Sequence, residues 1–130
     1  MSRKFKLGLD YNGVISDHSG MLAILSSILV KAGHEVHIIT GRRQIPEFEE
    51  ELDSLGIRYT HFFSIADHHK ELGTPMVGYE NNEPWLDANI WDATKADYCK
   101  RVQIDMHIDD SDTYGQYFET VYLQINKLEP

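Results

Sequence analysis

The chain has 130 residues, a length typical of one domain with a sizeable buried core. Its formal net charge of −9 argues against nonspecific binding to nucleic acid or to a membrane surface, because both are bound through clustered cations. No apolar run reaches the ~20 residues of a membrane span, and no secretory signal is recognisable. Its single cysteine, Cys99, is typical of a reducing compartment, so we expect a cytoplasmic protein.

The first elements predict a strand, a turn and a helix. An apolar run over residues 4–10 favours a buried strand that ends at Asp10, and Gly13 then allows the backbone to turn sharply. Ser19 can cap a helix over about residues 20–32. Ligands of open α/β sheets bind at the carboxyl ends of the strands, so Asp10 is a candidate functional residue. Its alternative role is to cap the turn.

The next segments alternate in the same way. Residues 34–40 (HEVHIIT) favour a second strand, a helix with Pro46 in its first turn ends at Gly56, and residues 57–64 favour a third strand. Strands that alternate with helices imply right-handed crossovers and a parallel sheet.

The second half is less regular. Residues 65–93 lack clear periodicity, and such a long segment in a compact domain is usually functional or mobile. They either pack over the sheet edge or form a specificity loop or an interface for homo-oligomers, with Trp85 and Trp91 as apolar contacts. The remaining expected elements are a helix over about 94–102, a strand over 104–110, a short helix near 112–118 and a strand over 120–125.

These elements predict a single α/β domain over residues 1–130. If the fourth strand lies beside the first, the doubly wound parallel sheet has the order 5-4-1-2-3 and forms a three-layer, Rossmann-like sandwich. This order would place Asp10 near Asp109 and Asp110. Two carboxylates ~4 Å apart repel by about 4 kcal/mol at an effective dielectric constant near 20. Such a cluster calls for a divalent cation, and hard oxygen donors with no nearby cysteine or histidine favour Mg²⁺.

Each polar residue at this edge also has an ordinary explanation. Thr40 could cap a helix, and the pair of Asp109 and Asp110 could form a turn. Lys95, which we expect in the first turn of its helix, would oppose the helix dipole there, although a nearby acidic cluster would attract it.

Four segments resemble, in their order along the chain, the four motifs of the haloacid dehalogenase (HAD) superfamily, which consists chiefly of phosphohydrolases. They are DYNGVI, IITGR, a lysine that opens a helix, and IDDSD. The resemblance covers about residues 4–125 and implies a small Mg²⁺-dependent phosphatase without a large cap, acting on a soluble phosphorylated substrate. It implies that Asp10 is the nucleophile that forms an aspartyl-phosphate. Thr40 and Gly41 would bind the phosphoryl group, and Lys95 would neutralise its charge, with Lys100 as a second candidate for this role.

The resemblance also implies a Mg²⁺ site in which Asp10 and Asp110 bind directly, Asp109 lies beside them, and Asn12 offers its backbone carbonyl. Members of the family commonly have an aspartate where this chain has Asn12, and that aspartate protonates the leaving group and then activates water. An amide can do neither, and general acid–base catalysis typically contributes ~10²–10⁴ in rate. Three hypotheses remain: good leaving groups, another acid such as His18 (otherwise a surface histidine), or a weak or inactive relative that binds a phosphorylated ligand or a partner.

Other motifs are weaker. Residues 67–69 (DHH) match the signature of another phosphoesterase family, but its upstream motifs are absent, so we interpret them as a chance match in a polar loop. A response-regulator receiver is excluded because its acidic pair ends the first strand. Cys99 is expected to be a small core residue. Four histidines alternate along the strands, where packing or hydrogen bonding is the commoner role: His34, His37, His61 and His107.

Overall fold

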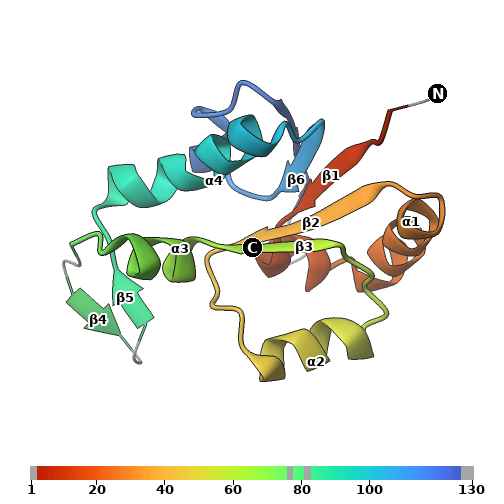
Figure 1. The fold of residues 1–130 in the computed structure, drawn as a ribbon, viewed down its shortest axis with the longest axis horizontal. Helices are drawn as coiled ribbons and strands as arrows, with labels where there is room; N and C mark the ends of the chain where they lie inside the picture. Colours follow the sequence, from red (N-terminus) through yellow and green to blue (C-terminus); the bar gives the residue numbers. More distant parts are fainter. Residues whose placement is uncertain (1–2, 76–77, 81–82, 127–130) are drawn as a thin grey trace.

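The computed structural model of the protein describes residues 3–75, 78–80 and 83–126. Its centre is a five-stranded parallel sheet with the order β3-β2-β1-β6-β7 (Figure 1). The strands are β1 (Lys6–Leu9), β2 (Glu35–Thr40), β3 (His61–Ser64), β6 (Met106–Asp109) and β7 (Val121–Gln124). Read from the β7 edge, this is the predicted order, with the first strand between the second and the fourth.

Helices pack against both faces of this sheet. They are α1 (Ser19–Lys31), α2 (Pro46–Ser54), α3 (Ile65–Leu72), α4 (Ala88–Val102) and α5 (Asp112–Gly115), and a kinked π-helical turn, η1 (Tyr11–Ile15), follows β1. Successive side chains of a strand point to opposite faces. Accordingly, Ile38 packs with Leu22 of α1 and Phe48 of α2 in one apolar cluster, whereas Ile39 packs with Cys99 of α4 in the other.

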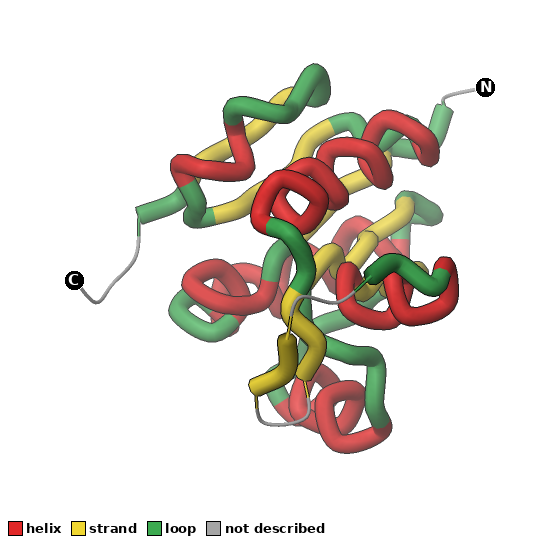
Figure 2. The backbone as a smooth tube through the Cα atoms, turned by 90° about the vertical axis from the view of Figure 1, so that its left-hand side faces the viewer, coloured by secondary structure: helices red, strands yellow, loops and turns green. Residues whose placement is uncertain are grey.

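A small antiparallel hairpin interrupts the pattern between α3 and α4. Its strands are β4 (Gly78–Glu80) and β5 (Glu83–Trp85), and they lie side by side, apart from the main sheet (Figure 2). The side chain of Trp85 lies outside the part of the chain that the structure describes. None of the helices among the described residues has the length and apolar character needed to cross a membrane.

Three expectations about the elements are wrong. The segment expected to be irregular contains α3, which Ser64 caps by accepting a hydrogen bond from Asp67 N at 3.0 Å. The DHH residues therefore lie on a helix and not in a loop. The third strand begins at His61 rather than at residue 57, because Thr60 binds the backbone of Val36 through its side chain before regular pairing starts.

The third error concerns α4, which begins at Ala88 and not near residue 94. The Asp87 side chain caps it by accepting a hydrogen bond from Asn89 N at 3.0 Å. Lys95 consequently lies in the middle of this helix, and the expected conflict with the helix dipole does not exist. Cys99 is fully buried, as predicted.

Candidate functional site

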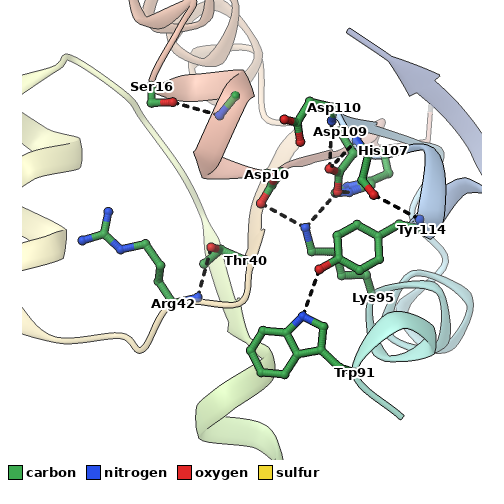
Figure 3. Close-up of polar contacts among 12 residues, drawn as sticks. Asp10, Ser16, Thr40, Arg42, Trp91, Lys95, His107, Asp109, Asp110 and Tyr114 are labelled. Carbon is green, nitrogen blue, oxygen red and sulfur yellow. Dashed lines mark hydrogen bonds and ion pairs between the residues drawn. The ribbon is translucent and has the colours of Figure 1, made fainter. Parts of the chain in front are cut away.

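The site forms where β1, β2 and β6 end at the same edge of the sheet. Asp10 follows β1 and is anchored there because its backbone N–H donates to the carbonyl of Ile108 at 3.1 Å. Thr40 is the last residue of β2, and Asp109 is the last residue of β6. All three are buried, and Figure 3 shows their side chains around one region.

Lys95 joins two of these strands from the opposite side. Its Nζ lies 3.0 Å from Asp10 Oδ1 and 2.8 Å from Asp109 Oδ2 (Figure 3), and the residue is only 1% exposed. A charge buried so deeply requires such partners. Burial opposes the ammonium form, but the two carboxylates outweigh it and hold the pKa of Lys95 above its ordinary value. The second lysine candidate, Lys100, instead pairs with Glu119 at the surface, at 2.9 Å.

Asp109 has hydrogen bonds at both carboxylate oxygens. Oδ2 accepts from Lys95 Nζ and from His107 Nε2 at 2.9 Å, while Oδ1 accepts from the backbone N–H groups of Asp110 at 2.8 Å and Ser111 at 3.3 Å. A carboxylate has about four acceptor positions, so these contacts occupy them. Burial raises the pKa of Asp109, but the His107 hydrogen bond and Lys95 outweigh it and hold this pKa well below its usual range. Asp109 is therefore a fixed anion.

His107 contradicts the expectation that no histidine lies near the acidic residues. It is fully buried, and its ring stacks on Phe118 with the centroids 5.2 Å apart. Burial lowers the pKa of His107, so the neutral ring donates from Nε2, and Nδ1 has no hydrogen-bond partner among the described residues. Its role is the hydrogen bonding and packing predicted for strand histidines. The spacing was a usable signal, because residues two apart on a strand share a face.

Asp10 differs from Asp109 in its charge state. Burial raises the pKa of Asp10 to about 7, and the nearby charge of Asp109 adds to the rise, while Lys95 opposes it. Asp10 and Asp109 share the single ammonium of Lys95, and Asp110 adds a third carboxylate with an oxygen within 4.8 Å of theirs. When all the carboxylates are ionised, the site carries excess negative charge.

The arrangement fits a divalent cation. Asp10, Asp109 and Asp110 offer carboxylate oxygens within 4.8 Å of one another. Gly13 has φ of 78°, and a Cβ at this position would overlap the Asp110 carboxylate, so a glycine is required for this close approach. Because both Asp109 oxygens already accept hydrogen bonds, Asp109 is poorly placed to bind the ion directly. Oxygen-only donors favour Mg²⁺ over transition metals.

Asn12 belongs to η1, and His18 immediately precedes α1. Asn12 is exposed in η1, where the turn is closed by a hydrogen bond from Gly13 N to Ser16 Oγ at 2.9 Å. His18 is half-buried, and its Nε2 lies 3.3 Å from the carbonyl oxygen of Asn126. This contact gives His18 a role in holding the segment after β7.

Two aromatic residues complete the other side of the site. Trp91 Nε1 donates to Tyr114 Oη at 2.9 Å, and the Tyr114 ring lies 4.5 Å from Lys95 Nζ (Figure 3). Trp91 also packs so closely on Gly41 that a Cβ there would meet the indole ring at 2.5 Å. Sequence reasoning missed Tyr114. It assigned Trp91 to a loop, although its position four residues before Lys95 places both on one helix face.

A scan against protein-family models, a search of curated proteins and a search of solved structures each find no match to this chain.

Proposed function

We propose that this chain is a doubly wound, HAD-like domain that hydrolyses a soluble phosphorylated substrate with Mg²⁺, through an aspartyl-phosphate on Asp10. The observation that carries the proposal is the position of Lys95 Nζ, which contacts both Asp10 and Asp109 where β1 and β6 end. With Thr40 at the end of β2, this arrangement supplies a carboxylate nucleophile, a fixed cation and a hydroxyl group at one sheet edge.

The residues divide the work of phosphoryl transfer. Ionised Asp10 attacks phosphorus, and the bond to the leaving oxygen breaks with its electron pair remaining on that oxygen. Lys95 holds the Asp10 carboxylate and neutralises charge on the phosphoryl group, to which the Thr40 hydroxyl donates a hydrogen bond. Because a carboxylate is a weak nucleophile, this positioning has to contribute much of the rate. Water then cleaves the aspartyl-phosphate to release inorganic phosphate and restore Asp10.

Asp10 and Asp110 would hold Mg²⁺, together with the backbone carbonyl of Asn12. The ion would supply positive charge at the phosphoryl oxygens and would favour the ionised form of Asp10. Asp109 would remain the hydrogen-bonded anion that fixes Lys95. This assignment follows from the contacts of Asp109, which already accepts hydrogen bonds at both oxygens.

Asn12 limits the substrates that this site can process. With no carboxyl acid at this position, the leaving oxygen departs without protonation by residue 12, and this favours aryl or acyl phosphates over alkyl phosphates. The same residue supports a second candidate function, in which the site binds a phosphorylated ligand or partner with little or no turnover.

Phosphate release tests the two functions against each other. A panel of aryl, acyl and alkyl phosphates is incubated with the protein, with and without Mg²⁺, and Asp10→Asn serves as the matched control. Release that requires both Mg²⁺ and Asp10 supports the hydrolase. If no substrate reacts while inorganic phosphate still binds in a calorimetric titration, the binding function replaces it.

A further inference from the structure

A second group of possible metal ligands lies near the amino ends of β2 and β3, at the opposite end of these strands from the candidate site. Glu35 is the first residue of β2, His37 lies two residues later on the same face, and His61 is paired with His37 across the β2–β3 register. Such residues converge because alternate side chains share a face and neighbouring parallel strands run side by side. The proposed hydrolase makes no use of these residues.

Their donor atoms are at distances suited to one metal ion. Glu35 Oε1 lies 2.8 Å from His37 Nε2 and 3.8 Å from His61 Nδ1, and the three residues offer ligand atoms within 4.8 Å of one another. Tetrahedral Zn²⁺ with bonds of about 2.0–2.1 Å separates its ligand atoms by roughly 3.3 Å, which lies between the first two distances. Small side-chain movements would therefore complete the geometry.

The largest movement required is a rotation of the His61 ring, and His61 is the most exposed of the three residues. The rings of His37 and His61 stack with centroids 4.2 Å apart and planes within 5°, so one ring has to turn for both nitrogens to face the same ion. The side chain of His61 is 49% exposed, whereas that of His37 is 2% exposed. His61 can turn at the surface, where its Nδ1 exchanges the contact with Thr60 Oγ1 at 2.8 Å for the ion, while His37 and Glu35 stay in place. The exposed side of His61 also gives the ion its entry path.

Tyr98 of α4 supplies a second-shell partner for His37. Its Oη lies 2.7 Å from His37 Nδ1, and its ring is stacked on Phe63. Without a metal, His37 donates from Nε2 to the Glu35 carboxylate. Metal binding through Nε2 moves this proton to Nδ1, where Tyr98 Oη accepts the hydrogen bond. Outer-shell partners of this kind fix the tautomer and orientation of metal-binding histidines.

The donor types also suit a transition metal. Glu35 offers a carboxylate oxygen, and His37 and His61 each offer a ring nitrogen. The nearby Lys6 ammonium donates to the carbonyl of Val102 at 2.9 Å. Two imidazoles and one carboxylate favour a transition metal over Mg²⁺, because nitrogen donors suit borderline ions such as Zn²⁺.

We propose that Glu35, His37 and His61 bind a divalent transition metal, best matched by Zn²⁺, with Tyr98 as second-shell partner and with the fourth position open to water. The ion joins β2 to β3 near their amino ends, at the opposite end of the sheet from the proposed phosphoryl site.

Zinc titration of the full chain tests this site. An Asp110→Asn background weakens cation binding at the acidic cluster, and calorimetry then measures the remaining Zn²⁺ sites. We expect one Zn²⁺ per chain. His61→Ala should weaken binding by more than tenfold, and Tyr98→Phe by about 10–100-fold, as typical for loss of a second-shell partner. His68→Ala on α3, a matched histidine outside the cluster, should leave it unchanged.

Cobalt substitution provides the direct readout of ligation. Co²⁺ bound by two imidazoles and a carboxylate in tetrahedral geometry absorbs visible light, and this band should be absent in His61→Ala and present in His68→Ala. No Zn²⁺ binding by the parent protein, or binding that survives both His61→Ala and Tyr98→Phe, would overturn the proposal. Neither result affects the phosphohydrolase, which is assayed separately.

Discussion

The carboxyl end and the amino end of the sheet each carry a histidine and a carboxylate two residues apart on one strand. His107 Nε2 lies 2.9 Å from Asp109 Oδ2 on β6, and His37 Nε2 lies 2.8 Å from Glu35 Oε1 at the start of β2. The difference lies in the third partner. Lys95 completes the buried pair on β6, whereas the half-exposed His61 faces the pair on β2. The same pair of residue types thus holds a fixed anion, Asp109, on β6 and supplies two of the proposed metal ligands on β2.

This comparison shows that a short motif does not determine its own chemistry. A lysine beside Asp109 supplies the positive charge, and further N–H groups occupy its remaining acceptor positions. The hydrogen bond from His37 and the nearby charge of Lys6 lower the pKa of the Glu35 carboxyl, but the Lys6 ammonium donates to the carbonyl of Val102 and forms no ion pair with Glu35 in the described part of the chain. Substitutions around Lys95 and the three carboxylates test this account of the charge balance at the carboxyl ends of the strands.

The largest expected change is in the rate of the proposed hydrolysis when a carboxylic acid replaces Asn12. Asn12→Asp should raise the rate on alkyl phosphates by one to several powers of ten, because general acids contribute ~10²–10⁴. Rates on aryl phosphates should change much less, since these leaving groups depart without a proton. Steady-state kinetics on matched aryl and alkyl substrates measures the difference.

Mass spectrometry of the peptide around Asn12 is the necessary control. Asn12 precedes Gly13, a context that favours deamidation, so an aged preparation could contain aspartate or isoaspartate at this position. If Asn12→Asp leaves every substrate inert although Mg²⁺ and phosphate bind, a missing acid is not the only defect and the binding function is favoured.

Removing the ammonium of Lys95, which Asp10 and Asp109 share, should destabilise the protein far more than removing an exposed ammonium. Lys95→Met leaves Asp10 and Asp109 buried without their partner and should lower the free energy of unfolding by about 3–5 kcal/mol at pH 7. Lys100→Met, on the same helix, breaks only the surface pair with Glu119 and should leave the urea midpoint unchanged. Equal effects of the two substitutions would contradict the central role of Lys95 at the buried edge.

Mg²⁺ affinity should distinguish the two adjacent aspartates. Asp110→Ala should weaken Mg²⁺ binding more than Asp109→Ala, because Asp109 is already hydrogen-bonded at both oxygens. Asp109→Ala should instead cause the greater loss of thermal stability, since it removes the partner of Lys95 and His107. Calorimetric titration with Mg²⁺ and thermal unfolding measure the two effects, and the opposite order of Mg²⁺ affinities would exchange their roles.

A further expected effect is a pH dependence of stability without metal. Asp10 has an ordinary pKa of 3.8 and a pKa of about 7 in the folded protein, so the folded state binds its proton more tightly. The contribution of Asp10 to stability therefore falls as pH rises from about 4 to about 7. Asp10→Asn should unfold at a higher temperature than the parent protein above pH 7 in EDTA, and this difference should shrink towards pH 4.

Added Mg²⁺ provides the control for this comparison. At the proposed Mg²⁺ site the ion should bind the parent protein better than Asp10→Asn, and it should therefore reduce or reverse the difference in unfolding temperature at pH 8. A difference that grows as the pH falls would show that burial does not raise the pKa of Asp10.

The first half of the fold could be predicted because its signals are local and redundant. Apolar periodicity marks α1 and α2, and Pro46 marks the start of α2. α3 escaped prediction because its short sequence, IADHHKEL, buries only Ile65, Ala66 and His69. The start of α4 was missed because none of residues 88–93 is buried, so their apolar side chains mark no core-facing side, and its cap, Asp87, precedes them.

The candidate site was predictable mainly where residues end strands. Asp10, Thr40 and Asp109 follow from strand pattern and sheet order, so the topology brings them together. Tyr114 could not be predicted, because its contact with Lys95 depends on how α5 packs against α4. Lys95 was placed correctly beside the acids for a reason that the structure removes, namely a position in the first turn of its helix.

The most direct test of the central claim is detection of the phosphorylated residue. The protein is mixed with an aryl phosphate and Mg²⁺, quenched in acid and analysed by peptide mass spectrometry, with Asp10→Asn treated identically. The expected result is an acid-stable, hydroxylamine-sensitive phosphoryl group on the peptide that contains Asp10, absent from Asp10→Asn and absent without Mg²⁺. Phosphate release by Asp10→Asn at the parent rate, or a phosphoryl group on another residue, would contradict the assignment of Asp10 as the nucleophile.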